Sequence, residues 1–109
     1  MPLSIQPITG ADLVAFDHEA VTVATTAIGF TTGTIAPATG RPAHRALVTL
    51  ETGQIRFTYD STTPSTTVGH LLEIGDTLVI EGISNVAAFR AIRTGATSGA
   101  IKCTFERFM

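Results

Sequence analysis

Apolar and polar residues alternate with a period of two along most of this chain, and this alternation restricts the fold more than any other feature of the sequence. From Val21 onward, no stretch shows the sustained spacing of three to four residues that an amphipathic helix needs. In residues 44–51, for example, Ala46, Val48 and Leu50 fall on one face. The pattern therefore predicts an all-β protein.

Turn-forming residues separate the alternating segments and indicate how they connect. The strongest hairpin signal is the pair at 52–53, which joins the segments 44–51 and 54–59. Two more strand pairs are expected, over residues 21–36 and over residues 86–108. Within 54–59, the alternation predicts Ile55, Phe57 and Tyr59 inward and Gln54, Arg56 and Thr58 outward. Six to eight short strands of this kind predict a compact antiparallel β-sandwich or a jelly-roll-like barrel.

The length of 109 residues allows one hydrophobic core and is too short for two domains of usual size. Residues 20–109 are predicted to form a single β-sandwich domain, and residues 1–19 an N-terminal arm. Within the arm, residues 11–16 are compatible with one helical turn or with an edge strand. Arms of this kind are either frayed or held on a neighbouring subunit.

Charged residues make up only 15% of the chain, whereas about 25% is typical of soluble domains. Threonine supplies much of the neutral polar surface, which suits a protein that buries its faces against copies of itself or partners. A net charge of −2 with a single lysine, Lys102, argues against nucleic-acid binding. The arginines form no basic cluster and no long apolar run begins the chain, so neither membrane binding nor a secretory signal is expected.

Candidate catalytic and metal-binding groups do not form a known pattern. The histidines His18, His44 and His70 lie far apart, and only His18 has acidic neighbours, which point to opposite sides on an extended chain. No nucleophile signature is present. The only cysteine, Cys103, is expected to be a buried thiol. Solvated turn and edge positions explain the remaining carboxylates, namely Asp60, Glu73, Asp76 and Glu81. We therefore expect a protein that is not an enzyme and has no cofactor.

From Leu47 to the C-terminus the chain resembles small structural proteins of tailed-bacteriophage virions. The resemblance rests on the sequences VTLET at 48–52, IRFTYD at 55–60, VGHLL at 68–72 and FRAI at 89–92, together with Pro64 and Gly75-Asp76. Proteins of this kind and size with a jelly-roll-like domain are often capsid decoration or cement proteins. The resemblance thus implies a non-enzymatic protein on the capsid surface, synthesised in the host cytoplasm, which binds the major capsid protein and stabilises the shell.

The expected partners are the major capsid protein and further copies of the chain, in a dimer or trimer. Candidate partner-binding residues come from the arm, the polar loop at 60–67 and arginines within apolar strands: Ile5, Ile8, Leu13, Phe16, Arg56, Thr62, Thr63, Thr66, Arg90 and Arg93. An alternative function is a tail, connector or receptor-recognition module, in which the loops at 60–67 and 94–99 contact a host sugar or protein.

Overall fold

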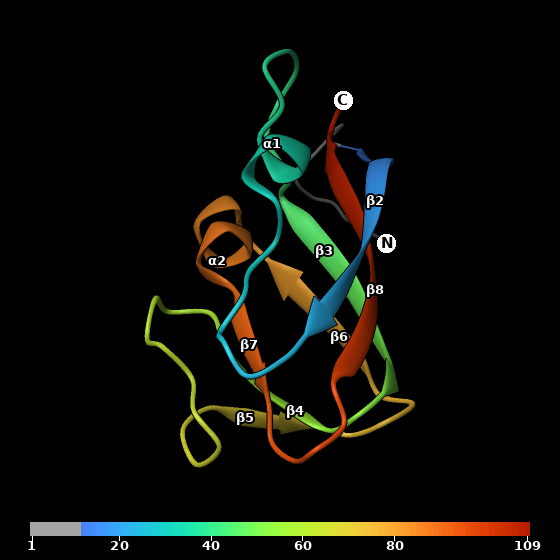
Figure 1. The fold of residues 1–109 in the computed structure, drawn as a ribbon. Coiled ribbons are helices and arrows are strands. Elements are labelled where there is room, and N and C mark those ends of the chain that lie inside the picture. The colour runs from blue at the N-terminus through green and yellow to red at the C-terminus, as the bar shows by residue number, and fades with distance from the viewer. Residues whose placement is uncertain (1–11) are drawn as a thin grey trace, which may run out of the picture.

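The computed structural model describes residues 12–109 and shows two antiparallel sheets that pack face to face (Figure 1). The elements are β2 (Leu13–Val23), α1 (Thr32–Ile35), β3 (Arg45–Thr52), β4 (Ile55–Thr58), β5 (His70–Leu72), β6 (Thr77–Glu81), α2 (Ile83–Ala88), β7 (Arg90–Arg93) and β8 (Gly99–Phe108). One sheet has the order β2-β8-β3-β6 and the other β5-β4-β7. Residues 12–109 therefore contain seven strands, and the prediction of an all-β sandwich of six to eight strands is confirmed.

The core lies between the sheets and is formed by the inward-facing positions that the alternation predicts. Val48 and Leu50 on β3 and Phe105 on β8 are almost fully buried. The ring of Phe30 stacks on that of Phe89 at 4.4 Å and meets the ring of Phe105 edge-on at 5.0 Å. Burial of each such side chain contributes about 1.5–3 kcal/mol, so this shared core is the main force that holds the two sheets together.

Among its changes of sheet, the chain crosses between β3 and β4 at Gly53 and between β7 and β8 just before Gly99, and these two crossings lie against each other. Gly53 has a φ of +69°, and a Cβ there would come within 2.5 Å of the carbonyl oxygen of Ser98. A Cβ at Gly99 would come within 2.5 Å of Ile55 Cγ2. The predicted hairpins at 44–59 and 86–108 are therefore wrong, because β3 and β4, and likewise β7 and β8, belong to different sheets.

Two further segments differ from the sequence prediction. The expected strand pair at 21–36 is absent from the described part of the chain, because β2 ends at Val23 and the chain then crosses to form α1. The expected strand at 86–93 is instead α2 followed by β7. Val86 and Phe89 both face the core at a spacing of three, and over so few residues this spacing is hard to distinguish from a strand pattern. No helix of residues 12–109 is long and apolar enough to cross a membrane.

The boundary of the predicted arm at residue 19 also needs correction. Residues 13–19 lie in β2, which pairs with β8 from Leu13↔Phe108 to Val23↔Gly99. A register shift between Ala15 and Asp17 interrupts the alternation, and this bulge hides the strand from a period-two search. The edge-strand alternative for this stretch is the one that the structure shows.

Candidate interaction site

The sandwich has four sheet edges, which differ in how they are protected. An edge strand presents unpaired backbone groups that can pair with another chain, so proteins usually cover or interrupt it. β2 and β7 form the edges on one side, and β6 and β5 form those on the other side. We call the side that carries β5 and β6 the open side, because within residues 12–109 neither strand has a pairing partner beyond it.

The edge of β7 is covered by the chain that follows β2. Ile28 and Ala91 exchange two backbone hydrogen bonds, of 2.9 Å and 2.8 Å. A third bond runs from the backbone N–H of Arg93 to the carbonyl of Ala24, at 3.0 Å. The backbone groups of this edge are thus largely satisfied within the chain.

The edge of β2 is interrupted by the bulge at Ala15 and Asp17 and carries charged side chains. Glu19 accepts hydrogen bonds from the backbone N–H of Thr31 at 3.0 Å and from its hydroxyl at 2.8 Å. A bulge and charges near the edge are devices that discourage pairing with another strand. The β2 edge therefore resists strand addition.

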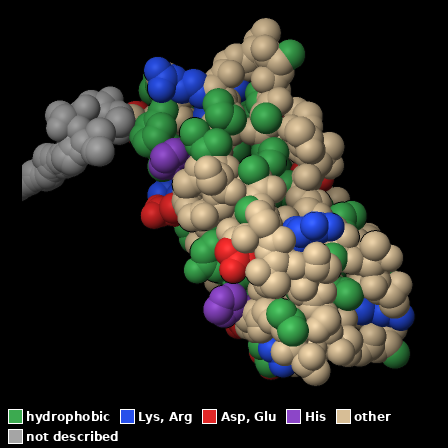
Figure 2. Space-filling model, turned by 90° about the vertical axis from the view of Figure 1, so that its left-hand side faces the viewer, with side chains coloured by type: hydrophobic (Ala, Val, Ile, Leu, Met, Phe, Trp, Pro, Cys, Tyr) green, Lys and Arg blue, Asp and Glu red, His purple; other side chains and the backbone are tan. Residues whose placement is uncertain are grey.

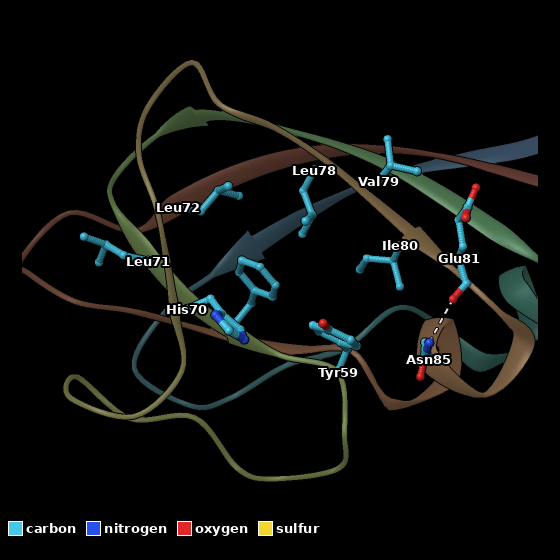
Figure 3. A pocket seen from close by; sticks show the side chains of 10 residues that line it. Tyr59, His70, Leu71, Leu72, Leu78, Val79, Ile80, Glu81 and Asn85 are labelled. Carbon is cyan, nitrogen blue, oxygen red and sulfur yellow. Dashed lines mark hydrogen bonds between the residues drawn. The ribbon is translucent and has the colours of Figure 1, made fainter.

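A groove of about 710 Å³ lies on the open side, between the edges of the two sheets. Leu72 from β5 and Leu78 and Ile80 from β6 point into it, whereas Val79 points away from it (Figure 3). Asn85 closes one end and donates a hydrogen bond of 2.9 Å from Nδ2 to the carbonyl of Glu81. Most of the residues that line the groove are apolar, and Tyr59, His70, Glu81 and Asn85 add polar groups, a lining that suits an extended chain with apolar side chains.

Three rings line the wall of the groove beside β5. The ring of Phe57 lies 5.4 Å from that of His70 and 6.4 Å from that of Tyr59, and Tyr59 and His70 are 6.0 Å apart. Tyr59 is 42% exposed, although the alternation predicted it inward, because β4 ends at Thr58. Thr58, predicted outward, is buried, and its hydroxyl donates to the carbonyl of Thr62.

A second hollow adjoins this wall beneath the loop that follows β4, and Asp60, Val68 and Gly69 contribute to its lining. The backbone N–H of Thr62 donates to Asp60 Oδ1 at 3.1 Å, and this hydrogen bond lowers the pKa of the Asp60 carboxyl. Asp60 is thus a charged loop residue held by its own turn.

Several large apolar side chains are exposed on the open side. Of the ten that are exposed in the described part of the chain, Tyr59, Leu71 and Val79 line the groove and Val68 lines the adjoining hollow. The face that carries α2 and the loop after β4 is covered mostly by uncharged side chains (Figure 2). Concentrated apolar exposure of this kind marks protein contact surfaces.

The structure does not bring the predicted partner-binding residues into one site. Ile5 and Ile8 lie outside the described residues. Leu13 and Phe16 lie in β2, where Phe16 packs against the core and the Arg107 guanidinium sits 4.3 Å from its ring centre.

The remaining candidates are scattered over the loop after β4 and the three-stranded sheet. Arg56 donates to the carbonyls of Thr66 at 3.0 Å and Gly69 at 2.9 Å, so its guanidinium holds the loop. The exposed positions are Thr62, Thr63, Thr66 and Arg90, while Arg93 is half-buried and donates to Ser98 Oγ at 3.3 Å. Of the ten candidates, only Thr62 lines either of the two hollows.

Sequence reasoning missed the residues that form the open side, namely Tyr59, His70, Leu71 and Val79. One signal was present in the sequence. Leu78, Val79 and Ile80 are three consecutive apolar residues in a short strand, so the strand must be apolar on both faces. An apolar outer face on an edge strand indicates a contact with another molecule.

Reactive groups do not converge in residues 12–109. No cluster of three or more histidine, cysteine or acidic residues that could hold a metal ion occurs there. Cys103 is buried on β8, and burial raises the pKa of its thiol to about 12.

Comparisons of the chain with protein-family models, with curated proteins and with solved structures found no match.

Proposed function

We propose that the protein is a non-enzymatic structural protein of a virion, which decorates the capsid by binding the major capsid protein and stabilises the shell. The observation that carries the proposal is the open side, where two sheet edges that residues 12–109 leave unpaired lie beside a groove. A protein that acts alone in water usually covers or charges such edges. The protein is therefore expected to act as part of an assembly.

Two sequence features support a shell rather than a soluble complex of few copies. Only 15% of the residues are charged, which favours close repeated contacts with neighbours. The stretch from Leu47 to the C-terminus, which resembles virion structural proteins, includes β5, β6 and the groove between them. Modest contacts at each site are sufficient for such a role, because the stabilisation that each bound copy gives is repeated at many equivalent sites of a shell.

Co-sedimentation of the purified protein with capsid shells that lack it tests the proposal. Binding that raises the temperature at which the shells break is expected. Leu71→Glu, at a side chain 43% exposed on the open side, should weaken this binding. Ile28→Glu is the matched control, since Ile28 is 41% exposed beside the covered β7 edge. Absence of binding by the unmodified protein, or labelling of virions at the tail alone, would refute the proposal.

A further inference from the structure

The outer edge of β6, which no strand of residues 12–109 pairs with, exposes a defined set of backbone groups. At its two ends, Gly82 donates to the carbonyl of His44 at 2.7 Å, and Asp76 accepts from the N–H of Leu50 at 3.1 Å. In an antiparallel ladder, alternate residues bond to the same neighbour, so residues 78 and 80 also bond to β3. The N–H and C=O groups of Thr77, Val79 and Glu81 must therefore point to the open side.

The position of Asn85 agrees with this assignment. Its side-chain amide reaches from α2 to the carbonyl of Glu81, which can only accept it if that carbonyl faces away from β3 (Figure 3). Val79, in the middle of the strand, has neither of its backbone groups bonded to another residue in the described part of the chain. β6 contains no proline, lysine or bulge, and its one charged residue, Glu81, stands at its end, so the middle of the strand carries none of the usual devices that block strand addition.

We infer that β6 pairs with β6 of a second copy, antiparallel and with the two-fold axis at Val79. This inference rests on the proposed function, which takes the open side to be a contact surface. It adds that the partner of the β6 edge is a second copy of the chain. Pairing centred on Val79 brings all three outward-facing positions into register, with Val79 opposite Val79 and Thr77 opposite Glu81 of the other copy. The Glu81 carbonyl, which accepts from Asn85, takes the N–H of Thr77 on its second lone pair. The two four-stranded sheets then form one continuous sheet of eight strands.

The side chains of β6 match this self-pairing. On the outer face, Leu47 lies beside Val79 and both are exposed, at 40% and 51%. The two-fold axis extends this pair into a row of four apolar side chains, two from each copy. Glu81 faces a threonine, and Arg45 of its own copy lies 3.5 Å from its carboxylate. No like charges oppose each other, so the edge is complementary to itself, as a two-fold interface requires.

Sedimentation of the full chain and of two lysine variants tests this dimer. The unmodified protein should sediment with twice the mass of one chain. Val79→Lys places two ammonium groups at the axis and should give a monomer with unchanged circular dichroism. Val14→Lys, at a 40% exposed valine on the β2 edge, should stay dimeric. A monomeric unmodified protein, or a Val79→Lys variant that remains dimeric, overturns the inference.

Disulfide formation under mild oxidation tests the register. Val79→Cys should cross-link to itself, because opposed residues in such a pair have Cα atoms about 5.5 Å apart, within disulfide range. Thr77→Cys mixed with Glu81→Cys should also cross-link, whereas Thr77→Cys alone should not. Cross-linking of Val79→Cys no faster than that of Val14→Cys overturns the inference. Shell binding by an unmodified protein that sediments as a monomer would overturn the dimer and leave the proposed function standing. A dimeric protein that binds no shell would overturn the proposed function and leave the dimer standing.

Discussion

At Gly53 a single hydrogen atom in place of a side chain allows the chain to change sheets. The residue has a φ of +69°, and a Cβ would lie 2.5 Å from the carbonyl oxygen of Ser98 and 2.7 Å from that of Thr97. Both neighbours are backbone atoms, which cannot move aside without disturbing the second crossing. We expect Gly53→Ala to lower the free energy of unfolding by about 3 kcal/mol, measured by urea denaturation.

Gly95→Ala is the control for this prediction. Gly95 lies in the loop between β7 and β8, and a Cβ there would meet nothing within 4 Å. Its free energy of unfolding should stay within about 0.5 kcal/mol of the unmodified value. Equal effects of the two substitutions would show that the crossings tolerate a side chain.

The thiol of Cys103 makes a pH-dependent contribution to stability. Burial, and to a smaller extent the carboxylate of Glu19, raise its pKa from 9.0 to about 12. Below pH 9 both the folded and the unfolded chain keep the proton, and the contribution is fully present. Between pH 9 and about 12 the unfolded chain loses the proton first, so stability falls, by at most about 1.4 kcal/mol per pH unit.

Denaturation of the unmodified protein and of Cys103→Ala between pH 8 and pH 11 measures this contribution. The variant should be less stable at pH 8 because it loses packing in the core. The difference in unfolding free energy between the two proteins should shrink as the pH rises above 9. Parallel curves across this range would show that the thiol is not shielded from water.

Among the elements, the loop between β4 and β5 depends on one side chain of β4. Arg56 donates hydrogen bonds to the carbonyls of Thr66 and Gly69, and these bonds close the loop against the sheet. Arg56→Met keeps the aliphatic stem but removes both bonds, at a cost of about 1–2 kcal/mol in local stability. Cleavage of the loop by a low-specificity protease should become several-fold faster. Arg90→Met, at an exposed arginine of β7, should leave the cleavage rate unchanged.

Most of the strands could be predicted from the sequence, but the first half of β2, the division of residues 86–93 between α2 and β7, and most connections could not. β3 and β8 follow the alternation closely, because inward positions such as Val48 and Ile101 must be apolar wherever the strand pairs. A turn at Gly53 could join two strands of one sheet or lead from one sheet to the other. The local sequence pattern is the same in both cases, because both need a turn and a change of direction. Only contacts distant in sequence, such as that of Gly53 with Ser98, distinguish the two.

The candidate site was harder to predict for the same reason. An edge strand is defined by what does not pair with it, and this depends on the order of all the strands. The cover of β7 comes from Ile28, more than sixty residues earlier in the chain, and no local pattern announces it. Arginines in strands were natural candidates for partner binding, yet Arg56 uses its guanidinium within the chain. The apolar run 78–80 was the local signal that the open side did provide.

At the scale of the whole molecule, the two sheets share one core and should unfold together. Phe30 and Phe89 stack between the crossing segment and the start of β7, and Phe105 of β8 completes the contact. Neither sheet alone keeps an apolar face covered. A domain whose only core spans both layers has no smaller unit that is stable in isolation, so a single cooperative transition is expected.

Two natural probes report on the two sheets separately and can check this cooperativity. Tyr59 is the only tyrosine and the chain has no tryptophan, so intrinsic fluorescence reports on the end of β4 at the open side. The reactivity of the buried Cys103 thiol reports on β8 in the other sheet. In urea, the fluorescence change and the exposure of the thiol should have the same midpoint. A fluorescence midpoint at clearly lower urea would mean that the three-stranded sheet opens first, and the groove would then lose the wall that β5 supplies while β6 stays in the four-stranded sheet.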